Sequence, residues 1–79
     1  MTPEQCRAGR ALIGASQDDL VMASGVAKAT IAAFELGHRK PYARTLSAIR
    51  AALETAGVEF IDANGGGPGV RLRSDGGGQ

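Results

Sequence analysis

The sequence predicts a mainly α-helical domain of four helices, followed by a short C-terminal β-hairpin or strand pair. Apolar residues recur at steps of three and four through residues 3–57, as they do on the buried face of a helix. Glycines divide that stretch into short segments. Beyond Gly57 the pattern changes to alternation, which is typical of strands. A chain of 79 residues is long enough for one small domain.

The first helix is predicted to run from Pro3 to about Ile13, with Thr2 as its N-cap, because proline fits the first turn of a helix. We expect Cys6 and Leu12 to face inward. Cys6 is the only cysteine, so the chain has no internal disulfide. We expect it to be a small buried hydrophobic residue rather than a reactive thiol.

Two short helices are predicted next, joined by a tight turn. Ser16 is a good N-cap for a helix that begins at Gln17, and Gly25 is a typical residue for ending it. A second apolar repeat covers about residues 27–36 and stops at Gly37. Two helices joined by a turn that contains glycine form a helix-turn-helix.

The apolar positions of these helices predict which faces are buried. Leu20 and Ala23 are expected to face the core from the first helix, and Ile31 and Phe34 from the second. The opposite flank of the second helix carries small residues and one cation, which are Lys28, Ala29, Ala32 and Ala33. A helix that enters a groove needs little bulk on that flank.

The fourth helix is predicted from about Thr45 to Ala56, with one apolar stripe formed by Leu46, Ile49 and Leu53. Arg50 and Glu54 have the spacing of a helical ion pair. The preceding residues 38–44 form the most basic window of the chain. Pro41 predicts a loop there.

The C-terminal region is predicted to contain strands at 58–61 and 70–73, joined by a glycine-rich loop. A lone hairpin is marginal in water, so it needs either the chain's own helices or the same segment of a second copy. We expect dimerisation through these strands. The side chains assigned to this contact are Val58, Phe60, Ile61, Val70 and Leu72. Residues 1–57 and 58–73 are thus two functional units, and 74–79 are expected to be a disordered tail.

Composition argues against an enzyme. The net charge is only +1, but residues 1–57 carry seven Lys or Arg against five Asp or Glu. Cys6 and His38 are the only candidates for a nucleophile and base, and one histidine with one cysteine cannot form a four-ligand zinc site. The glycines at 65–69 lack the residues of a phosphate loop. We expect no cofactor and no metal, and neither a membrane span nor a leader is visible.

Part of the chain has a family resemblance that covers roughly residues 4–56. It resembles the Cro and repressor type of helix-turn-helix known as the XRE family, which has a lambda repressor-like four-helix fold. The matching positions are Gln17, Leu20, Gly25, Val26, Thr30, Ile31, Glu35, Gly37, Pro41, Thr45, Leu46 and Ile49. The resemblance implies that residues 27–36 are the recognition helix in the DNA major groove and that Gln17 contacts phosphate. It also implies that Arg10 pairs with Glu35.

The expected partner is therefore double-stranded DNA. Lys28 can reach guanine, while Thr30 points either inward or to the DNA backbone. Ala27, Ala29 and Ala33 stand where family members often carry polar base-reading side chains, and alanine can contact a thymine methyl. The residues expected at phosphates are Gln17, His38, Arg39, Lys40 and Arg44. Tyr42 either donates its hydroxyl to a phosphate or packs under the loop.

The function predicted from these features is that of a small dimeric repressor, cytoplasmic and associated with the nucleoid, that binds an inverted repeat. An activator that contacts RNA polymerase is an alternative. Another is an adaptor or antitoxin-like module that uses the same fold to bind a protein.

Overall fold

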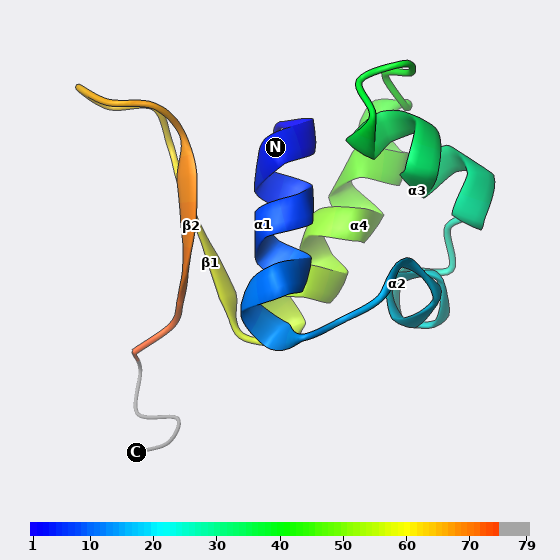
Figure 1. The fold of residues 1–79 in the computed structure, drawn as a ribbon, viewed down its shortest axis with the longest axis horizontal. Helices are drawn as coiled ribbons and strands as arrows, with labels where there is room; N and C mark the ends of the chain where they lie inside the picture. Colours follow the sequence, from blue (N-terminus) through cyan, green and yellow to red (C-terminus); the bar gives the residue numbers. More distant parts are fainter. Residues whose placement is uncertain (75–79) are drawn as a thin grey trace.

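The computed structural model describes residues 1–74, which form four helices and one two-stranded antiparallel sheet (Figure 1). The prediction of a mainly helical chain with a C-terminal hairpin is confirmed. The elements in chain order are α1 (Pro3–Ile13), α2 (Gln17–Ser24), α3 (Lys28–Glu35), α4 (Ala43–Thr55), β1 (Val58–Ile61) and β2 (Gly69–Leu72).

Helix α1 begins as predicted. The Thr2 hydroxyl accepts a hydrogen bond from the Gln5 backbone N–H at 3.0 Å, and the Gln5 side-chain oxygen accepts one from the Thr2 N–H at 2.8 Å. Each side chain thus satisfies a backbone donor that the first helical turn leaves open. The expectation for Leu12 is wrong, because its side chain is 40% exposed. It lies at the edge of the inward stripe that Cys6 and Gly9 define.

Helices α2 and α3 are each 8 residues long and are joined by a turn at Gly25, whose φ of 74° favours glycine. Ser16 and Asp19 cap α2 through two reciprocal hydrogen bonds of 2.9 Å. The prediction that Ala23 faces the core is wrong, since it is exposed. Leu20 is the buried residue of this short helix.

Helix α4 begins at Ala43, two residues earlier than predicted. Pro41 is buried and ends the loop, and the Tyr42 carbonyl accepts the N–H groups of Thr45 and Leu46. Ile49 and Leu53 are fully buried. They form the centre of the core with Cys6, Leu20, Ile31, Phe34 and Val58.

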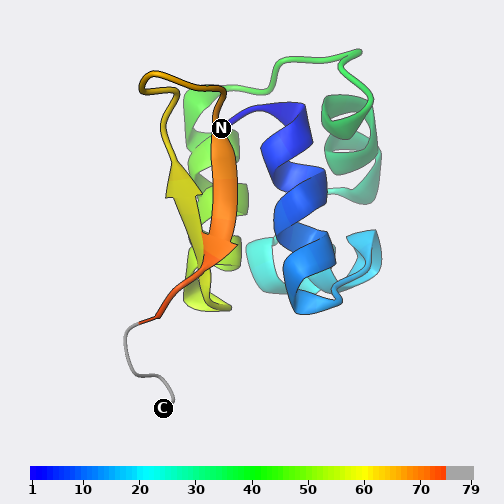
Figure 2. The same ribbon diagram turned by 60° about the vertical axis from the view of Figure 1, so that its left-hand side comes forward.

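The hairpin pairs Val58 with Leu72 and Phe60 with Val70. Strand β2 begins and ends one residue earlier than predicted, although the Arg73 N–H still donates to the Gly57 carbonyl at 2.8 Å. Figure 2 shows the hairpin as a layer over the helices, with β2 beside α1 and α4 behind β1.

The apolar face of the hairpin packs on its own chain, which answers a question that the sequence leaves open. Val58 is completely buried, and Phe60 and Val70 pack against the core. Val58 therefore cannot offer its side chain to a second copy, and the prediction is wrong for this residue. Of the other residues assigned to dimerisation, Ile61 is 36% exposed and Leu72 is 52% exposed.

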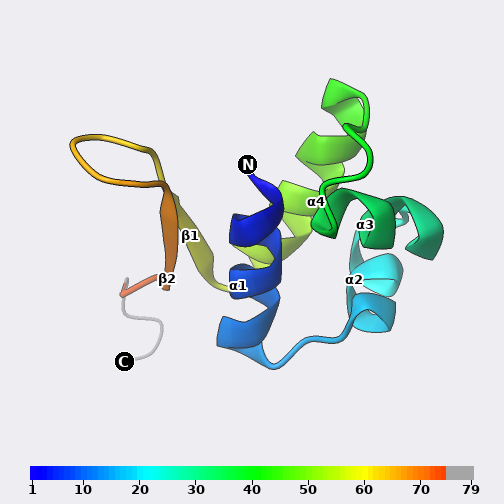
Figure 3. The same cartoon turned by 45° about the horizontal axis from the view of Figure 1, so that its top comes forward.

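Figure 3 shows the hairpin on one side of α1 and the α2–α3 pair on the other. Of the predicted tail 74–79, residues 75–79 lie outside the described residues. Within residues 1–74, no helix has the length and apolar character that a bilayer crossing requires.

Candidate nucleic-acid interface

The flank of α3 that faces away from the core is lined by small residues. Ala27, Lys28 and Ala29 are exposed, whereas Thr30 and Ala33 are half-buried. On the other flank Ile31 and Phe34 enter the core. Because alanine side chains are small, a binding partner can come close to the backbone of this helix.

Lys28 is the one cation of α3, and it is held by α2. Its ammonium group lies 2.9 Å from a carboxylate oxygen of Asp18, and the two side chains are 56% and 74% exposed. An ion pair in this environment contributes well under ~1 kcal/mol. Lys28 is therefore able to exchange Asp18 for another acceptor.

Glu35 lies at the end of α3 and joins three helices. Its carboxylate accepts hydrogen bonds from Arg10 Nε at 2.8 Å and Arg10 Nη2 at 2.7 Å, and from Gln17 Nε2 at 3.0 Å. The Arg10–Glu35 pair is thus present as predicted. The Glu35 side chain is only 3% exposed, so these bonds are shielded from water.

Two further α1 residues bind Glu35, and the sequence analysis missed both. The Cys6 thiol donates to a carboxylate oxygen at 3.1 Å, and the Arg7 guanidinium donates to the Glu35 backbone carbonyl. The four-residue spacing of Cys6 and Arg10 places them on one face of α1, and this spacing was the available signal. We call Cys6, Arg10, Gln17 and Glu35 the Glu35 cluster.

The charges of the cluster follow from its hydrogen bonds. Burial alone would raise the pKa of Glu35, but the donors Arg10, Gln17 and Cys6 outweigh it and lower that pKa, so the carboxylate is ionised. Burial and the neighbouring Glu35 raise the pKa of Cys6 to about 12. A thiol that is neutral and fully buried is a poor nucleophile.

The structure gives Gln17 a role in addition to the predicted phosphate contact. Its side chain is half-buried and its amide nitrogen already donates to Glu35. An amide nitrogen carries two hydrogens. Gln17 therefore has one N–H left for a phosphate while the other links α2 to α3.

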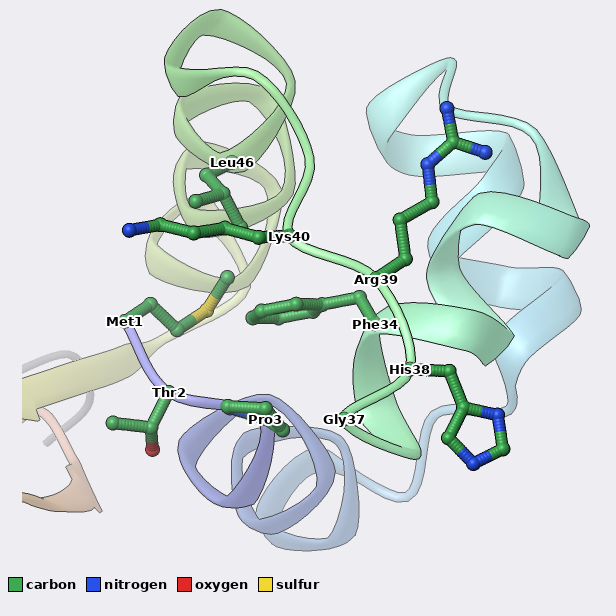
Figure 4. Close-up of a pocket in the computed structure, with 9 residues that line it drawn as sticks. All are labelled: Met1, Thr2, Pro3, Phe34, Gly37, His38, Arg39, Lys40 and Leu46. Carbon is green, nitrogen blue, oxygen red and sulfur yellow. The ribbon is translucent and has the colours of Figure 1, made fainter.

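We call the loop between α3 and α4 the basic loop. Its basic side chains extend in different directions. Figure 4 shows His38 and Arg39 extending to the α3 side of the loop, whereas Lys40 extends to the opposite side, near Leu46 of α4. All three basic residues are exposed. Arg39 therefore lies on the α3 side of the loop, and Lys40 does not.

Tyr42 and Arg44 are also at the surface. Tyr42 is 78% exposed, so it does not pack under the loop; the buried Pro41 occupies that position instead. Arg44 is exposed in the first turn of α4.

An open cavity of about 360 Å³ lies beside the basic loop. Figure 4 shows Phe34 and Met1 facing each other in it, below Leu46. The lining is completed by Thr2, Pro3, Gly37, His38, Arg39 and Lys40. In the described part of the chain, His, Cys, Asp and Glu side chains form no group of three that could hold a metal ion.

No protein-family model matches this chain, and no curated protein matches it either. The geometry of α3, the basic loop and the Glu35 cluster is therefore the basis for the proposal of function.

Proposed function

We propose that the chain is a transcriptional regulator that binds double-stranded DNA, with α2 and α3 forming a helix-turn-helix and α3 lying in the major groove. The observation that carries this proposal is the exposed flank of Ala27, Lys28 and Ala29 beside a loop whose Arg39 extends to the same side. A major groove is about 12 Å wide and accepts a helix. The exposed Arg39 guanidinium suits the phosphates at the edge of that groove.

The Glu35 cluster supports the same proposal. Binding a rigid duplex requires a helix that is held at a fixed angle before the DNA arrives. The hydrogen bonds from Arg10 on α1 and Gln17 on α2 converge on Glu35 of α3, so three helices share one buried anchor.

In this proposal Lys28 leaves Asp18 and donates to guanine O6 or N7, and Ala29 approaches a thymine methyl. Part of the specificity then comes from duplex shape, because alanines read few base edges. Arg39, His38 and Arg44 contact phosphates, and Gln17 does so through its remaining N–H. Lys40 contributes only a long-range charge.

The regulator acts as a dimer in the cytoplasm, at the nucleoid, with two copies of α3 about 34 Å apart on an inverted repeat. Repression follows when this complex blocks polymerase, and activation requires an additional surface for RNA polymerase. Mapping of bound genomic sites relative to promoters distinguishes the two.

The first test is titration of a fluorescent random duplex at low and high salt. We expect binding to weaken with salt, with Arg39→Ala reducing the salt slope by about 1 and Lys40→Ala reducing it less. The two residues are adjacent and equally charged, so this pair controls for net charge. Binding that ignores salt contradicts the proposal, and an equal effect of both substitutions contradicts the role of Arg39.

The second test separates base reading from backbone contact. Lys28→Ala should cost about 1–3 kcal/mol on the preferred site and much less on random DNA. Lys40→Ala is the matched control, because it removes one positive charge on the side of the loop opposite α3. An equal loss on both kinds of DNA for Lys28→Ala contradicts base reading.

One observation favours a protein-binding adaptor as the second candidate. Met22 on α2 is 86% exposed, and Leu36 at the end of α3 is 68% exposed. Exposed large apolar residues beside an alanine-rich helix suit a protein partner. Under this alternative, random duplex does not bind at any salt concentration.

A further inference from the structure

We propose that the open cavity beside the basic loop binds a small monocarboxylate with an apolar body, such as an aromatic acid. The carboxylate pairs with Lys40, and the apolar body fills the space between Phe34, Leu46 and Met1. The inference goes beyond the proposed function, because binding of this ligand does not require DNA. It also gives a role to the cation of the basic loop that the proposed DNA contacts do not use.

The cavity lies where the beginning of α1, the end of α3 and the basic loop meet (Figure 4). Its volume is about 360 Å³, which is within the range of small-molecule sites in proteins. An engineered apolar cavity of about 150 Å³ already accommodates benzene. The space beside the basic loop is thus large enough for two fused aromatic rings, or for one ring with a short chain.

The walls of the cavity are mainly apolar. Phe34 of α3 is only 4% exposed, while Leu46 of α4 and Met1 are half-buried. Figure 4 shows Phe34 and Met1 facing each other, with Pro3 at the start of α1 below them. An apolar ligand here removes the exposed parts of these side chains from water, and this burial favours binding.

Lys40 supplies a charge at the rim of the cavity. In Figure 4 its side chain runs between Leu46 and Met1 and carries its ammonium group beyond them. The methylene groups of Lys40 therefore extend the apolar wall, and the ammonium reaches water. Lys28, the other lysine of the chain, pairs with Asp18. In the described part of the chain, Lys40 has no carboxylate within salt-bridge distance.

The charges around the cavity select the class of ligand. The lining includes Lys40, His38 and Arg39 but no Asp or Glu side chain. The side chains of His38 and Arg39 extend to the other side of the loop, so Lys40 is the one of the three that lies along the cavity. One ammonium balances a single carboxylate, whereas a phosphate monoester carries close to two negative charges at neutral pH. A cationic ligand finds no opposite charge in this lining.

The first test compares two probes of the same shape, naphthoate and the corresponding uncharged naphthamide, by isothermal titration calorimetry of the full chain without DNA. We expect naphthoate to bind more tightly. Lys40→Met keeps the apolar stem but removes the charge. It should weaken naphthoate binding by about fivefold, as expected for a partly exposed ion pair, and leave naphthamide binding unchanged. Equal affinities of the wild-type chain for the two compounds, or binding of neither, overturn the inference.

Arg39→Met is the matched control. It removes the same charge from the neighbouring position, but the Arg39 side chain extends to the other side of the loop. Interactions between exposed charges are screened over about 8 Å at physiological salt, so this substitution should change naphthoate binding by less than about twofold. If Arg39→Met weakens binding as much as Lys40→Met does, the carboxylate responds only to net charge, and the inference is wrong.

Methyl NMR spectra locate the bound probe. Naphthoate should shift the methyl resonances of Met1 and Leu46, which line the cavity. The methyl resonances of Met22 and Leu72 should not move, although these side chains are 86% and 52% exposed. Shifts confined to Met22 and Leu72 would indicate binding to exposed apolar side chains in general and would overturn the inference.

The position of the site also bears on the proposed function, because Phe34 belongs to α3 and the basic loop carries Arg39. A bound carboxylate cancels the long-range charge of Lys40. Saturating naphthoate should therefore weaken binding to random duplex about as much as Lys40→Met does, and naphthamide should not. The two proposals fail separately: absence of naphthoate binding overturns only the carboxylate site, and absence of salt-dependent DNA binding overturns only the proposed function.

Discussion

The two sides of α1 are attached to it by different interactions. On one side the α2–α3 pair is held by the Glu35 cluster, in which charged and amide groups meet at 2.7 to 3.0 Å. On the other side the contacts of the hairpin and α4 with α1 are mainly apolar. Two hydrogen bonds add to them, because Gln5 Nε2 donates to the carbonyls of Ile61 at 3.3 Å and Gly69 at 3.0 Å. There Gly9 has no side chain, and a Cβ built on it would lie 3.4 Å from Val58 and 3.5 Å from Leu53.

The difference has a physical consequence. Hydrogen bonds to a buried carboxylate depend strongly on angle, so they fix how α3 is oriented relative to α1. Apolar packing depends mainly on the area and volume that are buried, so it fixes how tightly the hairpin closes. The polar side therefore sets the geometry of the candidate interface, and the apolar side supplies most of the core.

The largest effect is expected from breaking the polar side. Arg10→Met leaves the Glu35 carboxylate, whose side chain is 3% exposed, without its main partner. An uncompensated buried charge costs about 3–5 kcal/mol in the free energy of unfolding, measurable by urea denaturation. The double variant Arg10→Met with Glu35→Met should recover most of that loss. Unchanged stability in Arg10→Met would mean that the ion pair has no structural role.

A cavity on the apolar side should cost somewhat less. Leu53 is fully buried and lies within contact distance of Gly9. Leu53→Ala should lower the free energy of unfolding by about 3 kcal/mol, through lost transfer energy and the cavity left behind. Ala51→Gly, an exposed change in the same helix, is the control for helix propensity. Equal losses of unfolding free energy in the two variants would mean that Leu53 is not part of the core.

Acid should weaken the polar side first. The folded pKa of Glu35 is lowered from its ordinary value of 4.5 by hydrogen bonds that exceed the effect of burial. A lowered carboxyl pKa stabilises the fold above the ordinary value, and that stabilisation is lost as the pH falls through the folded pKa. Urea midpoints should therefore decline below about pH 4.5 more steeply in the wild-type chain than in Glu35→Gln. If the urea midpoints of the two chains declined in parallel with falling pH, carboxylates other than Glu35 would be responsible for the acid sensitivity.

The smallest effect is a gain on the apolar side. Gly9 lies inside α1, and the contacts of an added Cβ are at ordinary van der Waals distance. Gly9→Ala should raise the free energy of unfolding by about 0.5–1 kcal/mol, because glycine is costly inside a helix. Calorimetry should show a higher melting temperature for Gly9→Ala and a lower one for the bulkier Gly9→Val. A loss with alanine would show that Val58 and Leu53 have no room to adjust.

Local signals in the sequence were sufficient for most element boundaries. Thr2 and Ser16 cap their helices as predicted, and Gly25 ends α2 with a positive φ. These features depend on neighbours within four residues, which the sequence displays directly. The start of α4 was placed too late because Thr45 resembles a cap, whereas the chain uses the Tyr42 backbone after the buried Pro41.

The candidate site was predicted unevenly. The exposed flank of α3 follows from helical periodicity, and the Arg10–Glu35 pair follows from the family resemblance. The direction of side chains in the basic loop does not follow from either, because a loop has no repeating geometry. Arg39 and Lys40 were therefore predicted to have the same role, although their side chains extend to opposite sides of the loop.

The helices, their caps and the alternation of the two strands could be predicted from the sequence, since each depends on interactions between residues close in the chain. The packing of the elements was needed to show that Val58 belongs to the core of its own chain and that Cys6, Arg10 and Gln17 all converge on Glu35. Those contacts join residues 18 to 29 positions apart around one carboxylate. Their free energy depends on the exclusion of water by the assembled helices, and no short stretch of sequence contains that information.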